Sequence, residues 1–371
     1  MSAATPSAAL PQYIGPYRIV RKLGEGGMGA VFEALHEAIE RRVAIKVLHP
    51  AYAISPEFTV RFFNEARAVN RVDHPGLVQI FDYGQLPGGM AYIIMELLRG
   101  ESLSWRMKHS GGALSLSETL NIGWQLADAL AAAHNKQVVH RDLKPDNVML
   151  VPDPHMATGE RSKLLDFGIA KIAEAGGSSR QIRTRTNAIM GTPLYMSPEQ
   201  CAGAGGVDAQ SDVYSLGVML YEMLSGRRLF VAEGAGYIMG MHMFQEPTPI
   251  RAVAPSVPLP VAELVHRMLY KEKAQRPSML QVASTLASLF ILAPAPARRS
   301  PGCSETSVQD SGSQPRGLPS TLGLVASQIK SRQRLPRFLL AGGIVALVLP
   351  GVSFLFPGRK QPTTSATASA G

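Results

Sequence analysis

A glycine-rich pattern near the start of the chain has the spacing of a phosphate-binding loop. Residues 24–31 read Gly-Glu-Gly-Gly-Met-Gly-Ala-Val, so that Gly24, Gly26 and Gly29 form G-x-G-x-x-G. Glycine lets the backbone approach a ligand closely, which suits a cradle over phosphates. The same spacing occurs in dinucleotide-binding folds and in ordinary turns, and in such a fold residues 30–42 could form a helix.

A lysine in the next strand-like run favours phosphate over ribose as the group that is bound. A dinucleotide-binding fold needs an acidic residue about 20 positions after the glycines, at the end of a second strand. The run Val43-Ala-Ile-Lys-Val-Leu48 instead carries Lys46 in its middle. The residues therefore point to phosphate binding.

A predicted helix offers a carboxylate partner for Lys46. Residues 55–57, Ser-Pro-Glu, combine an N-cap, a proline at the first helical position and an acid in the first turn. The residues that then share one helix face are Phe58, Phe62, Glu65 and Val69. A carboxylate on an apolar stripe needs a partner, so we expect Glu65 to face Lys46. The alternative is a partly solvated glutamate at the edge of the stripe.

The densest run of polar side chains follows an apolar strand-like pair, residues 138–139. Residues 140–147 read His-Arg-Asp-Leu-Lys-Pro-Asp-Asn, and Asp166-Phe167-Gly168 begins nineteen positions after Asn147. Such a concentration of charge is costly unless it serves a purpose. We expect it to form a functional site together with the glycine loop, Lys46 and Glu65.

Taken in order, these motifs resemble the eukaryotic-type Ser/Thr protein kinases found in bacteria. The matching residues are the glycine loop, V-A-I-K at 43–46, H-R-D-L-K-P-D-N at 140–147, D-F-G at 166–168, and Ser197-Pro198-Glu199 where the family usually has Ala-Pro-Glu. Residues 212–217 and Arg276 match two structural anchors of the large lobe. The resemblance covers roughly residues 17–292.

The resemblance implies an α+β fold with two lobes and a set of roles for phosphoryl transfer. We expect a small β-rich N-lobe at about 17–97 and a large helical C-lobe at about 98–292. Catalysis in this family is mostly positioning and charge neutralisation. Asp142 would accept the hydroxyl proton, Lys144 would steady the transferring phosphoryl group, and Lys46, held by Glu65, would bind the α- and β-phosphates of ATP.

The resemblance also implies where the nucleotide and its metal bind. Asn147 and Asp166 would bind Mg²⁺, with Mn²⁺ as the alternative, because oxygen ligands suit both ions. The residues expected to bind ATP are Leu23, Gly24, Glu25, Gly26, Gly27, Met28, Gly29, Val31, Ala44, Lys46, Glu96 and Leu98. Plain hydrophobic core is an equally good interpretation of Val31 and Ala44.

Substrate class is read from the loop at 140–147 together with Thr192, and regulation from the segment between Asp166 and Glu199. The H-R-D-L-K-P-x-N form of the loop and Thr192 are typical of Ser/Thr kinases, so Ser and Thr hydroxyls of proteins are the expected acceptors. In the family a phosphothreonine of this segment pairs with the arginine before the catalytic aspartate, here Arg141. We expect autophosphorylation at Thr184 or Thr186, the alternative being that both are ordinary solvated residues.

Composition excludes several other classes. Hydrophobic residues make up 46% and charged residues 18% of the 371 residues, which suits a globular core rather than a wholly disordered chain. Two cysteines, Cys201 and Cys303, form neither a disulfide framework nor a metal-binding cluster. The net charge is +9, but residues 291–371 carry nine Lys and Arg against Glu305 and Asp310. The folded part is thus nearly neutral, which argues against nucleic-acid binding.

The ends of the chain differ in composition from its centre. Residues 1–16 are small, Pro-rich and uncharged, which predicts a disordered N-terminus without a secretory signal. Residues 293–337 predict a flexible basic linker. Residues 338–356 contain no charge and span about 28 Å as a helix at ~1.5 Å per residue, which predicts a single transmembrane helix, with a buried core helix as the alternative.

The charges that flank this segment predict its orientation. Lys330, Arg332, Arg334 and Arg337 precede it, and two basic residues follow. The larger basic cluster stays inside, so we expect a kinase domain on the cytoplasmic face of the inner membrane and a short extracytoplasmic tail at 357–371. The basic cluster would contact anionic lipids, and a homodimer in the membrane is one source of a signal.

Two rival functions are weighed against a protein kinase. A non-catalytic scaffold of the same fold would be expected to lack Lys46, Asp142 or Asp166, and all three are present. A small-molecule phosphotransferase would generally lack the segment Gly191–Glu199, which in kinases docks a peptide. Both features favour the protein kinase.

Overall fold

The computed structural model describes residues 11–26, 29–49, 52, 56–86, 89–167 and 193–292. The chain divides into two units, residues 1–300 and 301–371, and the described residues all belong to the first. Across these described ranges, no helix is both long and apolar enough to cross a bilayer. The predicted linker, transmembrane segment and tail lie outside them.

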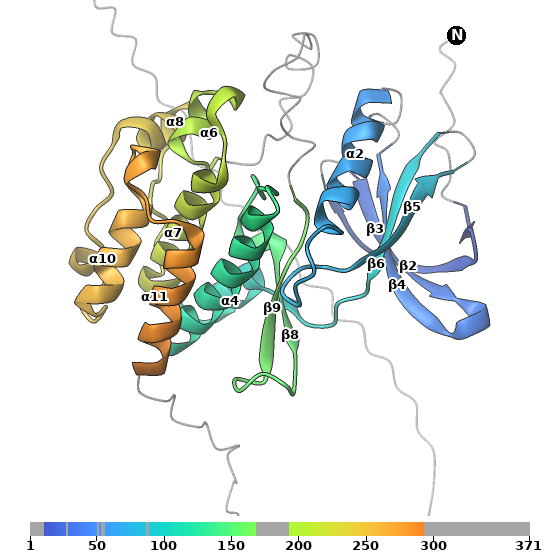
Figure 1. The fold of residues 1–371 in the computed structure, drawn as a ribbon, viewed down its shortest axis with the longest axis horizontal. Helices are drawn as coiled ribbons and strands as arrows, with labels where there is room; N and C mark the ends of the chain where they lie inside the picture. The colour runs from blue at the N-terminus through green and yellow to red at the C-terminus, as the bar shows by residue number, and fades with distance from the viewer. Residues whose placement is uncertain are drawn as a thin grey trace, which may run out of the picture. The chain divides into compact units, whose positions relative to one another are not determined.

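The first part of the fold is an antiparallel sheet in the strand order β1-β2-β3-β4-β6-β5. The strands are β1 (Tyr13–Ile14), β2 (Tyr17–Gly26), β3 (Gly29–His36), β4 (Arg41–Leu48), β5 (Ile80–Gln85) and β6 (Ala91–Glu96). Helix α2 (Pro56–Val69) lies across the sheet (Figure 1). It begins at the proline of the predicted N-terminal signal.

The link between β3 and β4 decides between the two interpretations of the glycine pattern. Residues 30–42 do not form a helix: β3 runs to His36, a single 3₁₀ turn η1 (Glu37–Ile39) follows, and β4 pairs back onto β3. Glu40 closes the turn with φ +52°. A dinucleotide-binding fold would need a helix here, so that alternative is wrong.

The structure corrects the predicted disorder of residues 1–16 for residues 11–16, while residues 1–10 lie outside the described ranges. Residues 13–14 form β1 and pair with Tyr17 and Arg18 of β2. Ile14 is fully buried in a cluster with Ala34 and Val43. One apolar side chain next to a turn is too short a pattern to reveal a strand, but burying it favours the ordered state.

The second part of the fold consists mainly of helices with one small sheet. The helices are α3 (Leu103–His109), α4 (Leu116–Asn135), α6 (Pro198–Ala202), α7 (Ala209–Ser225), α8 (Ala235–Phe244), α9 (Ile250–Val253), α10 (Leu259–Met268) and α11 (Met279–Leu292). Strands β7 (Glu101–Ser102), β8 (Val148–Pro152) and β9 (Glu160–Leu164) pair in that order. The 3₁₀ turns are η2 (Pro145–Asn147), η4 (Ala204–Gly206) and η5 (Lys273–Gln275).

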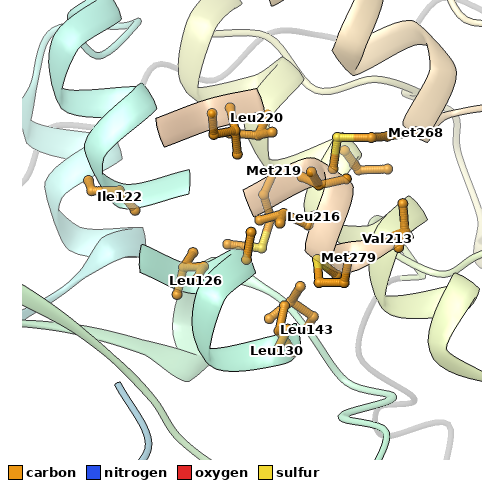
Figure 2. Close-up of a cluster of buried hydrophobic side chains, with 14 of the residues drawn as sticks. Ile122, Leu126, Leu130, Leu143, Val213, Leu216, Met219, Leu220, Met268 and Met279 are labelled. Carbon is orange, nitrogen blue, oxygen red and sulfur yellow. The ribbon is translucent and has the colours of Figure 1, made fainter. Parts of the chain in front are cut away.

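The core of this helical part fixes the loop that carries the polar motif. Helices α4, α7, α10 and α11 enclose the cluster drawn in Figure 2. Leu143 lies in this cluster beside Leu130 of α4, although its chain neighbours are Asp142 and Lys144 (Figure 2). Burying a leucine side chain stabilises by about 1.5–3 kcal/mol, so the loop is anchored between its two charged residues.

Backbone hydrogen bonds join the two parts next to the expected site. The amide of Val78 donates to the carbonyl of Leu164 at 3.0 Å, and the amide of Leu164 donates to Gly76 at 2.8 Å. Leu164 is the last residue of β9, and Asp166 follows two positions later. Asp166 is therefore carried by a strand that is bonded to the N-terminal part.

Candidate active site

The structure brings Lys46, Glu65 and Asp166 together. Lys46 lies on β4 and is buried, as is Glu65 on the face of α2 that the apolar stripe predicts. The Nζ of Lys46 is 2.8 Å from Oδ1 of Asp166 and 3.9 Å from Oε1 of Glu65. Lys46 is thus bracketed by two carboxylates, and the one from D-F-G is nearer than the predicted partner.

The electrostatics of this group keep Lys46 charged. Burial lowers the pKa of the amine, but the charges of Asp166, Glu65 and Asp142 outweigh burial and raise the pKa above its ordinary value. The carboxylate of Asp166 is 44% exposed, and its backbone has φ +40°. A non-glycine residue in this region is strained, so the surrounding bonds hold Asp166 in place.

A small cavity lies behind Lys46. It has a volume of about 20 Å³ and is lined by residues that include Glu65, Val78, Met95 and Phe167. This is room for about one water molecule. The cavity is far too small for a nucleotide and offers only a position where water could solvate the ion pair.

The polar loop at residues 140–147, called the catalytic loop below, forms the second half of the site. The side-chain amide of Asn147 donates to the carbonyl oxygen of Asp142 at 2.7 Å and to its Oδ2 at 3.1 Å. The Nζ of Lys144 is 3.3 Å from the same Oδ2. The amide of Leu165 donates to the carbonyl of Asn147 at 2.9 Å, which places Asn147 beside the segment that leads to Asp166.

Asp212, a buried aspartate of α7, holds the loop at residues 140–147 through hydrogen bonds to its backbone. Oδ2 and Oδ1 of Asp212 accept hydrogen bonds from the amides of His140 and Arg141, at 2.8 and 2.9 Å. His134 lies 2.7 Å from Oδ2 of Asp212. Burial raises the pKa of Asp212, but the bonds from His134 and the His140 amide outweigh it and lower the pKa below its usual range. Arg141 has φ +65°, a strained conformation that these bonds maintain.

His140 ties the catalytic loop to the segment before Asp166. Burial holds the pKa of His140 below its usual value, although nearby carboxylates oppose this, so the ring is neutral near pH 7. Its Nε2 lies 2.8 Å from the carbonyl of Leu165, and its Nδ1 accepts from the amide of Asp142 at 3.3 Å. The ring also packs against Phe167, with centroids 4.6 Å apart.

The described glycines of the loop differ in how closely the neighbouring backbone packs against them. A side chain at Gly29 would place its Cβ 2.1 Å from the carbonyl oxygen of Val47, so packing against β4 requires this glycine. At Gly24 and Gly26 a Cβ would meet no atom of the described structure within 4 Å. Their sequence neighbour Glu25 pairs with Lys22, while Gly27 and Met28 lie outside the described residues.

Two of the expected adenine contacts lie on the same face of the sheet as Lys46. Val31 pairs directly with Lys46 across β3 and β4, and Ala44 precedes Lys46 by two positions, so the three side chains share a face. Val31 and Ala44 also belong to the core cluster beneath α2. The structure is therefore compatible with both interpretations that the sequence left open.

The remaining expected contacts differ in their surroundings. Leu23 lies exposed on β2, and Leu98 is half-buried. Oε1 of Glu96 accepts from the amide of Gln79 at 2.7 Å and from Lys163 at 2.6 Å. Because its side chain is engaged there, a nucleotide contact from Glu96 would have to come from its backbone.

The segment after Thr192 is locked to the helical part, while Thr184, Thr186 and Thr192 lie outside the described residues. Glu199 forms a two-bond ion pair with Arg276, at 2.8 and 2.9 Å. Ser197 and Gln200 form a capping box at the start of α6. Gln200 also donates to the carbonyl of Arg141 at 2.7 Å. No pattern in the sequence signals this last contact, because the two residues are 59 positions apart.

The residues present fit a nucleotide and a divalent metal. Mg²⁺ takes few protein ligands and keeps waters and phosphate oxygens, and Asp166 with Asn147 offers oxygen atoms of this kind. Within the described ranges no group of three or more His, Cys, Asp or Glu could hold a metal by itself. The open space over Gly24 and Gly26 suits close approach by phosphates.

Comparison with known proteins decides the family. Residues 17–286 match the model of the protein kinase domain. The chain belongs to the protein kinase family. Its kinase domain is 43% identical over 263 residues to serine/threonine-protein kinase Pkn1 of Myxococcus xanthus, covering 71% of this chain and 36% of Pkn1. It is 41% identical over 266 residues to PknA of Mycobacterium tuberculosis, covering 71% of this chain and 58% of PknA.

The kinase domain is also similar to solved structures. The crystal structure of the PknI kinase domain of Mycobacterium tuberculosis superposes with a TM-score of 0.58 at 26% identity, covering 76% of this chain and 99% of that domain. The curated relatives are longer than the part they share with this kinase domain, which spans about a third of Pkn1 and under three-fifths of PknA. The similarity is therefore one between kinase domains.

Proposed function

We propose that this chain transfers the γ-phosphoryl group of ATP to Ser and Thr hydroxyls of proteins. The observation that carries the proposal is the convergence of Lys46, Asp166 and the pair Asp142 and Asn147 from three separate segments of a kinase-family chain. The relatives Pkn1 and PknA are serine/threonine-protein kinases by name, which supports the choice of acceptor.

The roles proposed for the residues follow from where they lie. ATP would supply the phosphoryl group, and a bound Mg²⁺ or Mn²⁺ would neutralise part of the phosphate charge. Lys46 binds phosphate oxygens and must leave its 2.8 Å contact with Asp166 to do so, with Glu65 remaining as its carboxylate partner. Asp142 accepts the proton of the hydroxyl group. Lys144, beside Asp142, stabilises negative charge on the transferring group.

An activity assay tests the proposal directly. We expect Asp142→Asn to reduce transfer of labelled γ-phosphate to a basic protein by at least about 10²-fold, because general-base catalysis contributes about 10²–10⁴-fold. Asp146→Asn is the matched control, since Asp146 lies in the same loop and is exposed. Equal transfer by wild type and Asp142→Asn would show contamination, and ATP binding without transfer would favour the scaffold.

We also propose that a phosphothreonine at position 184 or 186 pairs with Arg141. Nε of Arg141 is buried and has no hydrogen-bond partner within the part of the chain that is described. Burial lowers the pKa of this guanidinium, with Asp212 opposing, and a phosphate would compensate the buried charge. Phosphopeptide mapping of active protein that finds neither threonine modified would contradict the proposal.

The proposed setting is the cytoplasmic face of the inner membrane. Support comes from the apolar run 338–356 and the basic residues that precede it. Proteins with accessible Ser and Thr residues would be the substrates, and anionic lipids would contact the basic cluster. A second copy of the chain would be a partner if the segment associates within the bilayer.

A further inference from the structure

Helix α8 has few means of its own to hold its position. Its ten residues include Gly236 and Gly240, and each glycine costs roughly 1 kcal/mol relative to alanine inside a helix. Gly234 at the N-cap offers no side-chain cap, and the first turn has no acidic residue. Within the helix Ile238 and His242 are buried. The position of α8 therefore depends on contacts with other elements.

A lysine from another part of the chain caps the C-terminal end of α8. Nζ of Lys271 donates to the carbonyl oxygen of His242 at 2.9 Å and to that of Met241 at 3.5 Å. A cation at a helix C-terminus also interacts favourably with the helix dipole. The same Nζ lies 4.9 Å from the ring centre of Phe230 and 5.6 Å from that of Tyr214, within the range of cation–π attraction.

The hydroxyl group of Tyr214 contacts both Lys271 and His242. The Tyr214 hydroxyl accepts from Nζ of Lys271 at 3.3 Å and lies 3.0 Å from Nδ1 of His242. The hydroxyl group therefore connects Nζ of Lys271 to the ring of His242. Burial lowers the pKa of His242 to about 4, with the charge of Lys271 adding to the effect, so the ring is neutral.

His242 connects α8 to the segment after Thr192. The ring is completely buried, and the backbone of Pro193 and Leu194 lies against it. Nε2 makes no hydrogen bond to any described residue. Helix α8 also packs beside α6, the helix that follows this segment (Figure 1). The contacts that start at Lys271 and run through Tyr214 and His242 thus reach the backbone of Pro193 and Leu194. The family resemblance assigns this segment to docking of a peptide substrate.

We infer that Lys271 is a positioning residue for protein substrates, which acts by holding α8, Tyr214 and His242 against the Pro193-Leu194 backbone. The inference rests on the proposed kinase function and adds a determinant of substrate binding to it. No contact joins Lys271 to Lys46, Asp142 or Asp166 in the described residues. Its effect is therefore on the acceptor protein and not on ATP.

Steady-state kinetics on the full chain provide the first test, with myelin basic protein as acceptor. We expect Lys271→Met to raise KM for the acceptor roughly tenfold, the equivalent of losing one charged hydrogen bond, with KM for ATP and kcat within twofold of wild type. Lys271→Arg should restore most of the loss, because it keeps the charge. Equal changes in both KM values, or none, would overturn the inference.

The matched control is the neighbouring lysine. Lys273 lies two positions away and pairs with Asp208 at 2.7 Å, with both side chains substantially exposed. Lys273→Met removes the same charge but touches neither α8 nor Tyr214, so we expect wild-type KM for the acceptor. The same rise in both variants would show a general effect of charge and would contradict the inference.

A second measurement needs no kinase activity. Amide hydrogen exchange should be faster in residues 235–244 of Lys271→Met than in wild type, and unchanged in α4. If wild type transfers no phosphate but this difference is present, the proposed function fails and the structural link stands. If Lys271→Met does not fold, Tyr214→Phe, which keeps the ring and loses the hydroxyl, should show a smaller change in the same direction, and unchanged exchange would overturn the inference.

Discussion

At the scale of single residues, the ion pairs around Lys46 set the state of the site. Lys46 contacts Asp166 at 2.8 Å and Glu65 at 3.9 Å. Asp166 is proposed as a metal ligand, so it cannot serve Lys46 and a cation equally. Binding of nucleotide and metal would therefore move Lys46 away from Asp166 and leave Glu65 as the residue that holds it.

The three described glycines of the loop, Gly24, Gly26 and Gly29, separate into two kinds at this scale. We expect Gly29→Ala to destabilise the protein by at least about 1–3 kcal/mol, because its Cβ would lie 2.1 Å from the carbonyl of Val47. Gly26→Ala should change stability by less than about 0.5 kcal/mol, since a Cβ there meets no atom of the described residues within 4 Å. Urea denaturation of both variants measures the difference.

Gly26→Ala, the variant that should keep its stability, is the one that should weaken nucleotide binding. If phosphates approach the backbone at Gly26, Gly26→Ala raises KM for ATP severalfold although the fold is intact. A Gly26→Ala variant with wild-type KM for ATP would argue against a phosphate cradle at this position. Equal loss of stability in both variants would contradict the distinction between them.

The sequence predicted the site residues that belong to a local pattern. It did not predict the contacts between residues that are far apart along the chain. The period of α2 placed Glu65 on the buried face, and the H-R-D-L-K-P-D-N run marked the loop. The closer contact between Lys46 and Asp166 joins residues 120 positions apart, and Gln200 reaches Arg141 over 59 positions. Such contacts depend on how the elements pack, which no local pattern encodes.

At the scale of elements, the start of α7 supports the catalytic loop. Asp212 accepts two backbone amides of that loop and contacts His134. We expect Asp212→Asn to lower the free energy of unfolding by about 2–4 kcal/mol, because the amide group offers one acceptor and turns a donor toward a donor. Phosphate transfer should fall as well, since the strained backbone of Arg141 loses its support.

The loss of stability in Asp212→Asn should depend on pH in one direction. The folded structure lowers the pKa of Asp212, so its contribution to stability is present above the ordinary pKa of about 4 and is lost as pH falls below that value. The difference in unfolding free energy between wild type and Asp212→Asn should therefore shrink from pH 6 to pH 3. Urea titrations across this range check it, and a constant difference would show that Asp212 is not the group responsible.

The elements themselves were predicted where the pattern was long. The helix predicted to begin at residues 55–57 is α2, and α11 ends at Leu292, where the composition changes. Strand β1 was missed because two residues carry no periodicity. It forms because Ile14 is buried and Tyr13 pairs with Arg18, which are tertiary effects.

At the scale of the whole molecule, the prediction that follows from charge and hydropathy is a membrane anchor. Residues 338–356 lack charge, and the net positive charge is concentrated around them. We expect the full chain to remain in the membrane fraction after extraction at alkaline pH. Replacing Ile344 and Leu347 with arginine should release it, because each charge at the centre of a membrane helix costs about 2.5–3.5 kcal/mol.

The control adds charge outside the apolar segment. Ser327→Arg lies in the basic linker and should leave the chain in the membrane fraction. The released double variant should still transfer phosphate to a protein acceptor, since the kinase domain, residues 17–286, does not include this segment. Extraction of wild type along with the double variant would show that 338–356 does not anchor the chain, and retention of both would mean that another part of the molecule binds the membrane.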